Sequence, residues 1–203
     1  MTGTRRPIAA IAALTAIGAG LTSMPACAHV TGNIGGGLAA GALHPLTGLD
    51  HLLAMVSVGI WGAELGPPAI WLLPIGFPLI MAFGGALGIV GMPLPATELL
   101  IALSVITLGA LVALARPLPL WVALLVVGIF AIAHGHAHGV ELPQSSDALA
   151  FTVGFVFATG LLHAIGIVIG LATRWPVGAL AIRLGGGMIA GAGCFFLYLY
   201  ADA

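Results

Sequence analysis

The sequence predicts an all-α, polytopic helical membrane protein, and its composition is the first reason. Of the 203 residues, 61% are hydrophobic and only 5% are charged, whereas about a quarter of the residues in average soluble domains are charged. The second reason is that the apolar residues form long continuous runs, while the strands of a membrane β-barrel alternate apolar and polar residues. We therefore expect one domain of membrane-spanning helices joined by short loops.

The first 28 residues are predicted to be a cleaved signal peptide. Arg5 and Arg6 precede the apolar stretch 8–21, and Ala26-Cys27-Ala28 supplies the small residues that signal peptidase prefers before its cleavage site. Two alternatives stay open: a first helix that is retained, and a lipoprotein attached through the cysteine of this motif.

The mature domain would span residues 29–203 and begin at His29. The new α-amine and the imidazole of His29 can chelate a divalent ion together, so His29 is a candidate capture site. Cleavage removes Cys27 and leaves Cys194 alone, so no intramolecular disulfide is expected.

The rest of the chain predicts six membrane spans, because each span needs about twenty apolar residues and the breaks fall at Pro, Gly and the rare charges. Pro45, Pro95 and Pro176 each stand where a first helical residue is expected, since their missing N–H costs nothing there. The six predicted segments are 45–63, 69–90, 95–115, 118–138, 148–173 and 176–201.

A short apolar and glycine-rich stretch, 34–43, precedes the first predicted span. It is too short to cross a bilayer. We expect it to form a half-helix or re-entrant segment that lines a cavity.

The few charges predict how the chain is oriented in its membrane. A cleaved signal puts the mature N-terminus on the periplasmic or extracellular side, and six spans then place Arg116 and Arg174 on cytoplasmic turns, with Arg183 close to them. This agrees with the excess of positive charge that cytoplasmic loops carry. Four acidic residues fall at the exterior ends of the spans: Glu98, Glu141, Asp147 and Asp202.

The same charges exclude several partners. The chain has 5 Lys and Arg residues, 6 Asp and Glu residues and a net charge of -1. This leaves too little positive surface for phosphates, so we expect no nucleic acid. No Walker sequence indicates a nucleotide. The expected surroundings are lipid, and a homo-oligomer stays open.

Histidines are the residues most suggestive of function, because an ionisable group within a membrane is costly unless it is paired, hydrated or bound to something. The chain has 7 histidines, and five of them fall in two short stretches, 44–51 and 134–141. Imidazole is the commonest protein ligand for transition metals, and a nearby carboxylate compensates the charge of a divalent ion. The two stretches therefore predict a transition-metal site.

Helix geometry constrains the first stretch. His44 and His51 lie about 20° apart around a straight helix but about 10 Å apart along its axis, so a break at Pro45 would help both to reach one ion. Asp50 is either a direct ligand or a partner that orients an imidazole.

The second stretch has the spacing of a metal pair on one helix. His134 and His138 are one turn apart, and Glu141 follows by another turn if the helix continues that far. His136 points to a different face. The alternative is that these histidines are hydrogen-bonded residues of helix packing.

These elements resemble the HupE/UreJ family of bacterial membrane proteins. The resemblance rests on the signal sequence, on His44-Pro…Asp50-His51, on His134-Gly-His-Ala-His-Gly-Val-Glu141 and on the six-span layout. It covers essentially the whole mature chain. It implies a secondary permease for nickel, or cobalt, that serves a nickel enzyme such as hydrogenase or urease.

The resemblance also implies roles for single residues. The family's important positions correspond to His44, Asp50, His51, His138 and Glu141, with Phe77 and Glu98 on the second and third spans. Phe77 is alternatively packing, and Glu98 alternatively complements the helix dipole. His163 lies in a family-like Leu-Leu-His stretch, or is bonded to the Thr159 carbonyl.

Together these predictions give a metal site of His44, Asp50, His51, His134, His138 and Glu141, and a transport path that includes Phe77, Glu98, His136 and His163. The resemblance implies Ni²⁺ or Co²⁺ as the substrate, while ligand chemistry alone does not choose among nickel, cobalt, zinc and copper. No resident cofactor is expected. We expect no enzyme, because the His-Glu-x-x-His motif is absent. The alternative is a metal chaperone or sensor for enzyme maturation that does not transport. Energy coupling stays open.

Overall fold

The structure, a computed structural model, describes residues 34–142 and 147–202. The predicted signal peptide 1–28 and the candidate capture residue His29 lie outside the described residues. Within them the chain is helical, without a strand: α2 (Ile34–Thr47), α3 (Leu49–Leu65), α4 (Ala69–Ile89), α5 (Thr97–Leu114), α6 (Leu120–Glu141), α7 (Ala148–Gly170), a 3-10 turn η1 (Leu171–Arg174) and α8 (Pro176–Ala201). The all-helical prediction is confirmed for the described part of the chain.

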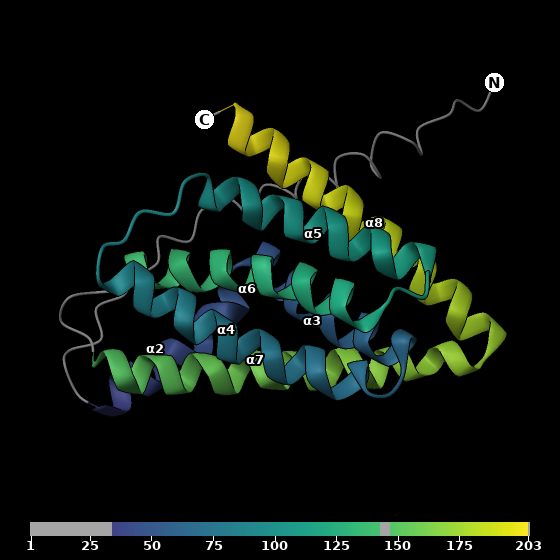
Figure 1. Ribbon diagram of the computed structural model, residues 1–203, viewed down its shortest axis with the longest axis horizontal. Helices are drawn as coiled ribbons and strands as arrows, with labels where there is room; N and C mark the ends of the chain where they lie inside the picture. The colour runs from purple at the N-terminus through teal and green to yellow at the C-terminus, as the bar shows by residue number, and fades with distance from the viewer. Residues whose placement is uncertain (1–33, 143–146, 203) are drawn as a thin grey trace, which may run out of the picture.

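Five helices, α4 to α8, are long and apolar enough to cross a membrane. The sixth candidate span is a bent pair, in which α2 and α3 meet at 83°. The chain is thus a multi-pass membrane protein of five spans, or six if the bent pair counts as one. The helices α4 to α8 lie side by side, roughly along the long axis of the molecule (Figure 1).

The predicted start of the first span at Pro45 is wrong. Pro45 lies inside α2, near its end, and the chain turns at Gly48, whose extended backbone (φ −89°, ψ 113°) separates α2 from α3. A proline in the last turn removes one helical hydrogen bond and thereby weakens the end of the helix. Thr47 donates its hydroxyl proton to the His44 carbonyl at 2.7 Å, and the new helix begins beyond the glycine.

Two other boundaries also differ from the prediction. Pro95 is not a first helical residue, because α5 begins only at Thr97, whose hydroxyl donates to the Leu94 carbonyl at 2.9 Å. Helix α6 continues three residues beyond the predicted end at His138 and includes Glu141. Pro176, in contrast, does stand in the first turn of α8.

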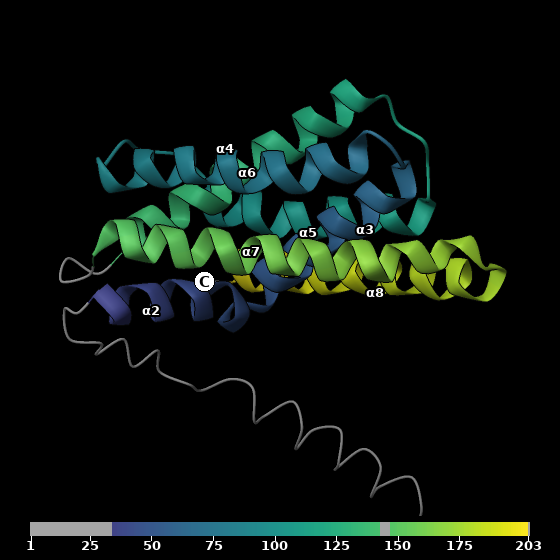
Figure 2. The ribbon, with the colours of Figure 1, turned by 90° about the horizontal axis from the view of Figure 1, so that it is seen from below.

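The helices pack in pairs, α4 on α6 and α5 on α8, while α7 packs along both α2 and α3. Figure 2 shows α2 beside α7 at one end of the bundle. Glycines permit the close approaches, as is usual between membrane helices. A Cβ atom at Gly135 of α6 would overlap the Met81 carbonyl of α4, and one at Gly59 of α3 would overlap the His163 carbonyl of α7.

Candidate metal site

Three helix ends, from two distant parts of the sequence, meet at one end of the bundle and bring four histidines together. The ring centroid of His138, on α6, lies 4.7 Å from that of His44 on α2 and 4.4 Å from that of His51 on α3. His51 in turn lies 4.8 Å from His134. The 83° bend between α2 and α3 is what lets His44 and His51 approach the same residue. We call these four residues, together with Asp50 and Glu141, the histidine cluster, and this end of the bundle the histidine end.

His44, His138 and Glu141 form the best-arranged ligand set within the described residues. Each offers one ligand atom, and these atoms all lie within 4.8 Å of one another. Glu141 Oε2 is 3.5 Å from His44 Nε2 and 4.0 Å from His138 Nδ1. Ligands about 2.1 Å from one metal ion lie about 3.4 Å apart in a tetrahedral site. The set therefore needs only a small contraction to hold an ion.

Asp50 contacts His51 and not the three-residue ligand set. Its Oδ1 accepts hydrogen bonds from the His51 backbone N–H and from Nδ1 of the His51 ring, each at 2.8 Å. A carboxylate bound to Nδ1 holds the proton on that nitrogen and leaves Nε2 as a free acceptor. His51 Nε2 is buried and has no hydrogen-bond partner. The geometry therefore favours the orienting role for Asp50 over the direct one.

His134 shows the same pattern deeper in the bundle. Its ring is fully buried, and Nδ1 donates to the Phe130 carbonyl at 2.9 Å. A carbonyl only accepts hydrogen bonds, so Nδ1 carries the proton and Nε2 presents its lone pair. Nε2 of His134 and both ring nitrogens of His138 are buried without hydrogen-bond partners. Unpartnered buried nitrogens are costly, and a bound transition-metal ion would satisfy them.

His136 lies on another face of α6, as the spacing predicts, and outside the cluster. Its Nε2 donates to the Met92 carbonyl at 2.7 Å, and Nδ1 lies 3.4 Å from the Thr97 hydroxyl. Both nitrogens are thus engaged with the loop and helix start that follow α4. This environment favours an anchoring role over a place on a metal path.

Phe77 is fully buried and lies between two histidines. Its ring centroid is 5.7 Å from that of His134 and 5.4 Å from that of His163. His163 donates from Nδ1 to the Pro74 carbonyl at 3.0 Å, so the alternative of a bond to the Thr159 carbonyl is wrong. The reason is that Pro78 has no N–H to bond the carbonyl four residues before it, which leaves that carbonyl free for His163.

Glu98, at the start of α5, lines a cavity that reaches the histidine cluster at Asp50. The cavity has a volume of about 300 Å³ and is lined by Asp50, Glu98, Ala102, Phe196, Leu199 and Tyr200. Two carboxylates from α3 and α5 thus share one cavity. Asp147, another of the predicted exterior carboxylates, caps α7 by accepting from the Leu149 and Ala150 N–H groups at 3.0 Å each.

The structure also reveals polar residues that the sequence analysis did not single out. Both carboxylate oxygens of Glu64, near the end of α3, are buried without a hydrogen-bond partner, and so is the Thr159 hydroxyl on α7. The rarity of charged residues was the signal that could have identified Glu64, because only 5% of the residues are charged and this one directly follows the predicted span 45–63.

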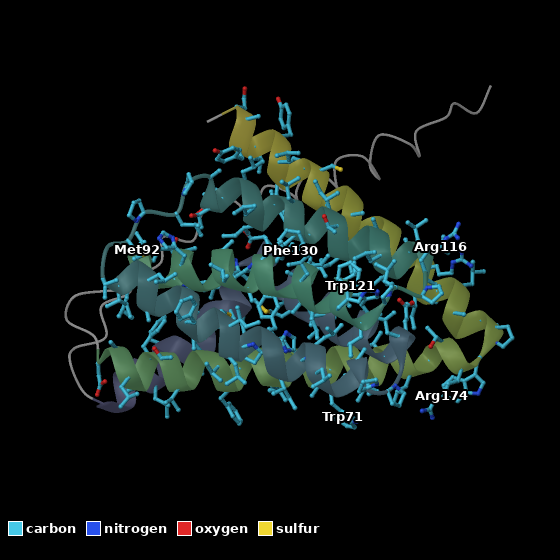
Figure 3. The ribbon with its side chains drawn as sticks, in the orientation of Figure 1. Trp71, Met92, Arg116, Trp121, Phe130 and Arg174 are labelled. Atoms are coloured by element: carbon cyan, nitrogen blue, oxygen red, sulfur yellow. The ribbon has the colours of Figure 1, made fainter. Side chains whose placement is uncertain are left out.

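Arginines lie at the end of the bundle opposite the histidine cluster. Figure 3 places Arg116 and Arg174 at one end and Met92 at the other. Arg183, in the second turn of α8, donates from Nε to the Ala113 carbonyl at 3.1 Å and so lies near the end of α5. We call this end of the bundle the arginine end.

Comparison with known proteins gives two matches. The family model described as "HupE / UreJ protein" matches residues 15–196. The Protein HupE of Rhizobium leguminosarum bv. viciae is 46% identical over 176 residues, which cover 86% of this chain and 92% of the relative. No solved structure matches the chain.

Proposed function

The chain belongs to the HupE/UreJ family, and from that premise we propose that it is a secondary permease which takes up Ni²⁺, or Co²⁺, across the bacterial inner membrane. The metal would serve the maturation of a nickel enzyme such as hydrogenase or urease. The histidine end faces the periplasm and the arginine end the cytoplasm, in keeping with the excess of positive charge on cytoplasmic loops.

The observation that carries this proposal is the ligand set at the histidine end. His44 is partly exposed, Glu141 is exposed and His138 is buried, so an arriving ion meets the carboxylate and the outer imidazole first. It then exchanges water for the buried imidazole. Glu141 and Asp50 together bring two negative charges, which compensate a divalent ion and lower the cost of removing it from water.

The number of ligands suits transport better than storage. Binding in a transport site must be weak enough for release, and a closed cage of four ligands is typical of structural metal sites. Here three ligand atoms lie together, and the free Nε2 atoms of His51 and His134 lie beyond them. An ion can therefore exchange one imidazole for the next as it moves inward.

Uptake of Ni²⁺ by sealed vesicles that contain the purified protein tests the proposal. We expect accumulation of Ni²⁺ that Co²⁺ inhibits. We also expect His138→Gln and Glu141→Gln to lower the uptake rate by more than about tenfold. Asp202→Asn, which removes an exposed carboxylate at the end of α8, is the matched control and should transport at the unaltered rate.

Binding without accumulation in the vesicles would reject the permease and favour a chaperone or sensor. Unaltered uptake by both cluster variants would reject the site.

A further inference from the structure

The buried polar atoms that lack a partner are not scattered over the bundle. Within the described residues, nine buried side-chain nitrogen and oxygen atoms have no hydrogen-bond partner, and all of them belong to helices α3, α6 and α7: His51, Trp61, Glu64, His134, His138, Thr159 and His163. Folded proteins leave few such atoms unpaired, and each one costs free energy. Because these atoms are confined to three helices, they could all be satisfied by a ligand that moves along the space between those helices.

These atoms are ordered in depth from the histidine end. His138 contacts Phe155 of α7, with ring centroids 4.3 Å apart. Because α7 runs away from that end, Thr159 lies about 6 Å deeper than Phe155 and His163 about 12 Å deeper. On α3, Glu64 lies about 20 Å beyond His51. The unpartnered atoms therefore extend from the histidine cluster toward the arginine end.

Phe77 divides this series into two parts. His134 and His163 contact its ring from two different helices. Both imidazoles donate from Nδ1 to a backbone carbonyl, and both leave a buried Nε2 free. His163, the deeper imidazole, thus presents a free Nε2 lone pair just as His134 does, and the aromatic ring of Phe77 lies between them.

Within the described residues, Glu64 is the one acidic residue whose buried side-chain oxygens have no partner, and it lies toward the arginine end. No ion pair joins Glu64 to Arg183 within the part of the chain that the structure describes. Arg183 instead donates to the Ala113 carbonyl. Trp61, one turn before Glu64 and on the same side of α3, has a buried indole N–H without a partner. A carboxylate buried in this way needs a cation or a proton.

We infer that the structure contains a second, inner metal station, in which His163 receives the divalent transition-metal ion past Phe77 and Glu64 is its last ligand before release. This inference rests on the proposed function. The change from imidazole to carboxylate favours exit, because imidazole suits late transition metals better than carboxylate does. Phe77 keeps the two stations apart, so the ion passes only when the ring moves.

The test compares binding with transport in the full-length protein. Ni²⁺ binding in detergent is measured by calorimetry, and Ni²⁺ influx is measured in sealed vesicles. We expect His163→Leu and Glu64→Gln to bind Ni²⁺ within about twofold of the unaltered protein, while influx falls by more than about tenfold. Asp202→Asn is again the control for loss of a carboxylate. Glu64→Asp, which keeps the carboxylate, should recover most of the influx.

Two outcomes would overturn the inner station. One is unaltered influx in His163→Leu and Glu64→Gln while His138→Gln transports poorly, which leaves the proposed function standing. The other is a parallel loss of Ni²⁺ binding in both variants without recovery in Glu64→Asp, which indicates a structural role. Failure of the unaltered protein to transport at all would reject the proposed function itself, and the inner station with it.

Discussion

Replacement of Asp50 tests whether this carboxylate fixes the tautomer and the orientation of the His51 ring for metal binding. The Asp50 carboxylate accepts from Nδ1 of His51 at 2.8 Å and also binds the backbone N–H of the same residue. Partners of this kind fix the tautomer and the ring orientation of a ligand, and their loss typically lowers metal affinity by about 10- to 100-fold. That range corresponds to about 1.4–2.8 kcal/mol.

We expect the two substitutions at this position to differ. An asparagine oxygen still accepts the Nδ1–H bond but lacks the charge, so Asp50→Asn should lie near the lower bound, about tenfold. Asp50→Ala removes the bond and should approach about 100-fold. Calorimetric titration of the purified protein with Ni²⁺ measures both.

The variant Glu98→Gln tests whether Asp50 acts by orienting the His51 ring or only by its negative charge. Glu98 lines the same cavity as Asp50, and no hydrogen bond joins its side chain to an imidazole in the described part of the chain. If Asp50 acts by orienting His51, Glu98→Gln should weaken Ni²⁺ binding clearly less than Asp50→Asn does. Equal losses of Ni²⁺ affinity in the two variants would mean that Asp50 acts only through its negative charge. Unaltered Ni²⁺ affinity in Asp50→Ala would refute a role of Asp50 in metal binding.

Four further outcomes are expected. Gly48→Ala should weaken Ni²⁺ binding by up to about tenfold, because its Cβ would lie 3.0 Å from the Asp50 carboxylate and 3.1 Å from the His51 ring; calorimetry measures this, and unaltered affinity would contradict it. His136→Gln should lower the free energy of unfolding by about 1–3 kcal/mol and leave the Ni²⁺ affinity unchanged, because the His136 ring bonds to the Met92 carbonyl. A loss of Ni²⁺ affinity at unaltered stability would place His136 on the metal path. Phe77→Ala should destabilise the fully buried site by about 3–5 kcal/mol, whereas Phe77→Leu should fold and pass Ni²⁺ faster in the vesicle assay; slower passage would argue against a gate. Acidification should weaken Ni²⁺ binding, because protonated imidazole does not bind metal; titrations at several pH values check this, and a flat profile would exclude imidazole ligands.

Much of the fold could be predicted from the sequence because a membrane span is set by length and apolarity. The helices α4 to α8 begin and end within a few residues of the predicted segments. The first span is the exception. Pro45 signals a helix boundary, but the proline is accommodated in the last turn of α2 and the chain bends only at Gly48. Sequence analysis expected the break at Pro45, and it did not identify Gly48 as the turning point because a glycine in an extended conformation leaves no periodic signal.

The part of the candidate site that lies on one helix could be predicted from the sequence, and the part that depends on the bend could not. His138 and Glu141 share a helix, and their spacing alone brings them together. The addition of His44 depends on the 83° bend, a tertiary feature that helix geometry on a straight axis does not contain. The sequence did contain a signal for the bond from His163 to the Pro74 carbonyl. Pro78 follows four residues after Pro74 and lacks the N–H that would otherwise bond to that carbonyl.

The missed residue Glu64 shows how a charge in a membrane chain is best interpreted. Sequence analysis assigned four carboxylates, Asp147 among them, to the exterior ends of the spans by topology, and in the structure Asp147 caps α7. Topology gives no account of a carboxylate whose two oxygens are both buried and unpartnered. Such a group is tolerated in a bilayer only when something satisfies it. Because α3 carries the His51 imidazole at one end and this carboxylate at the other, the helix itself links the two ends of the inferred route, and a displacement of α3 would act on both stations at once.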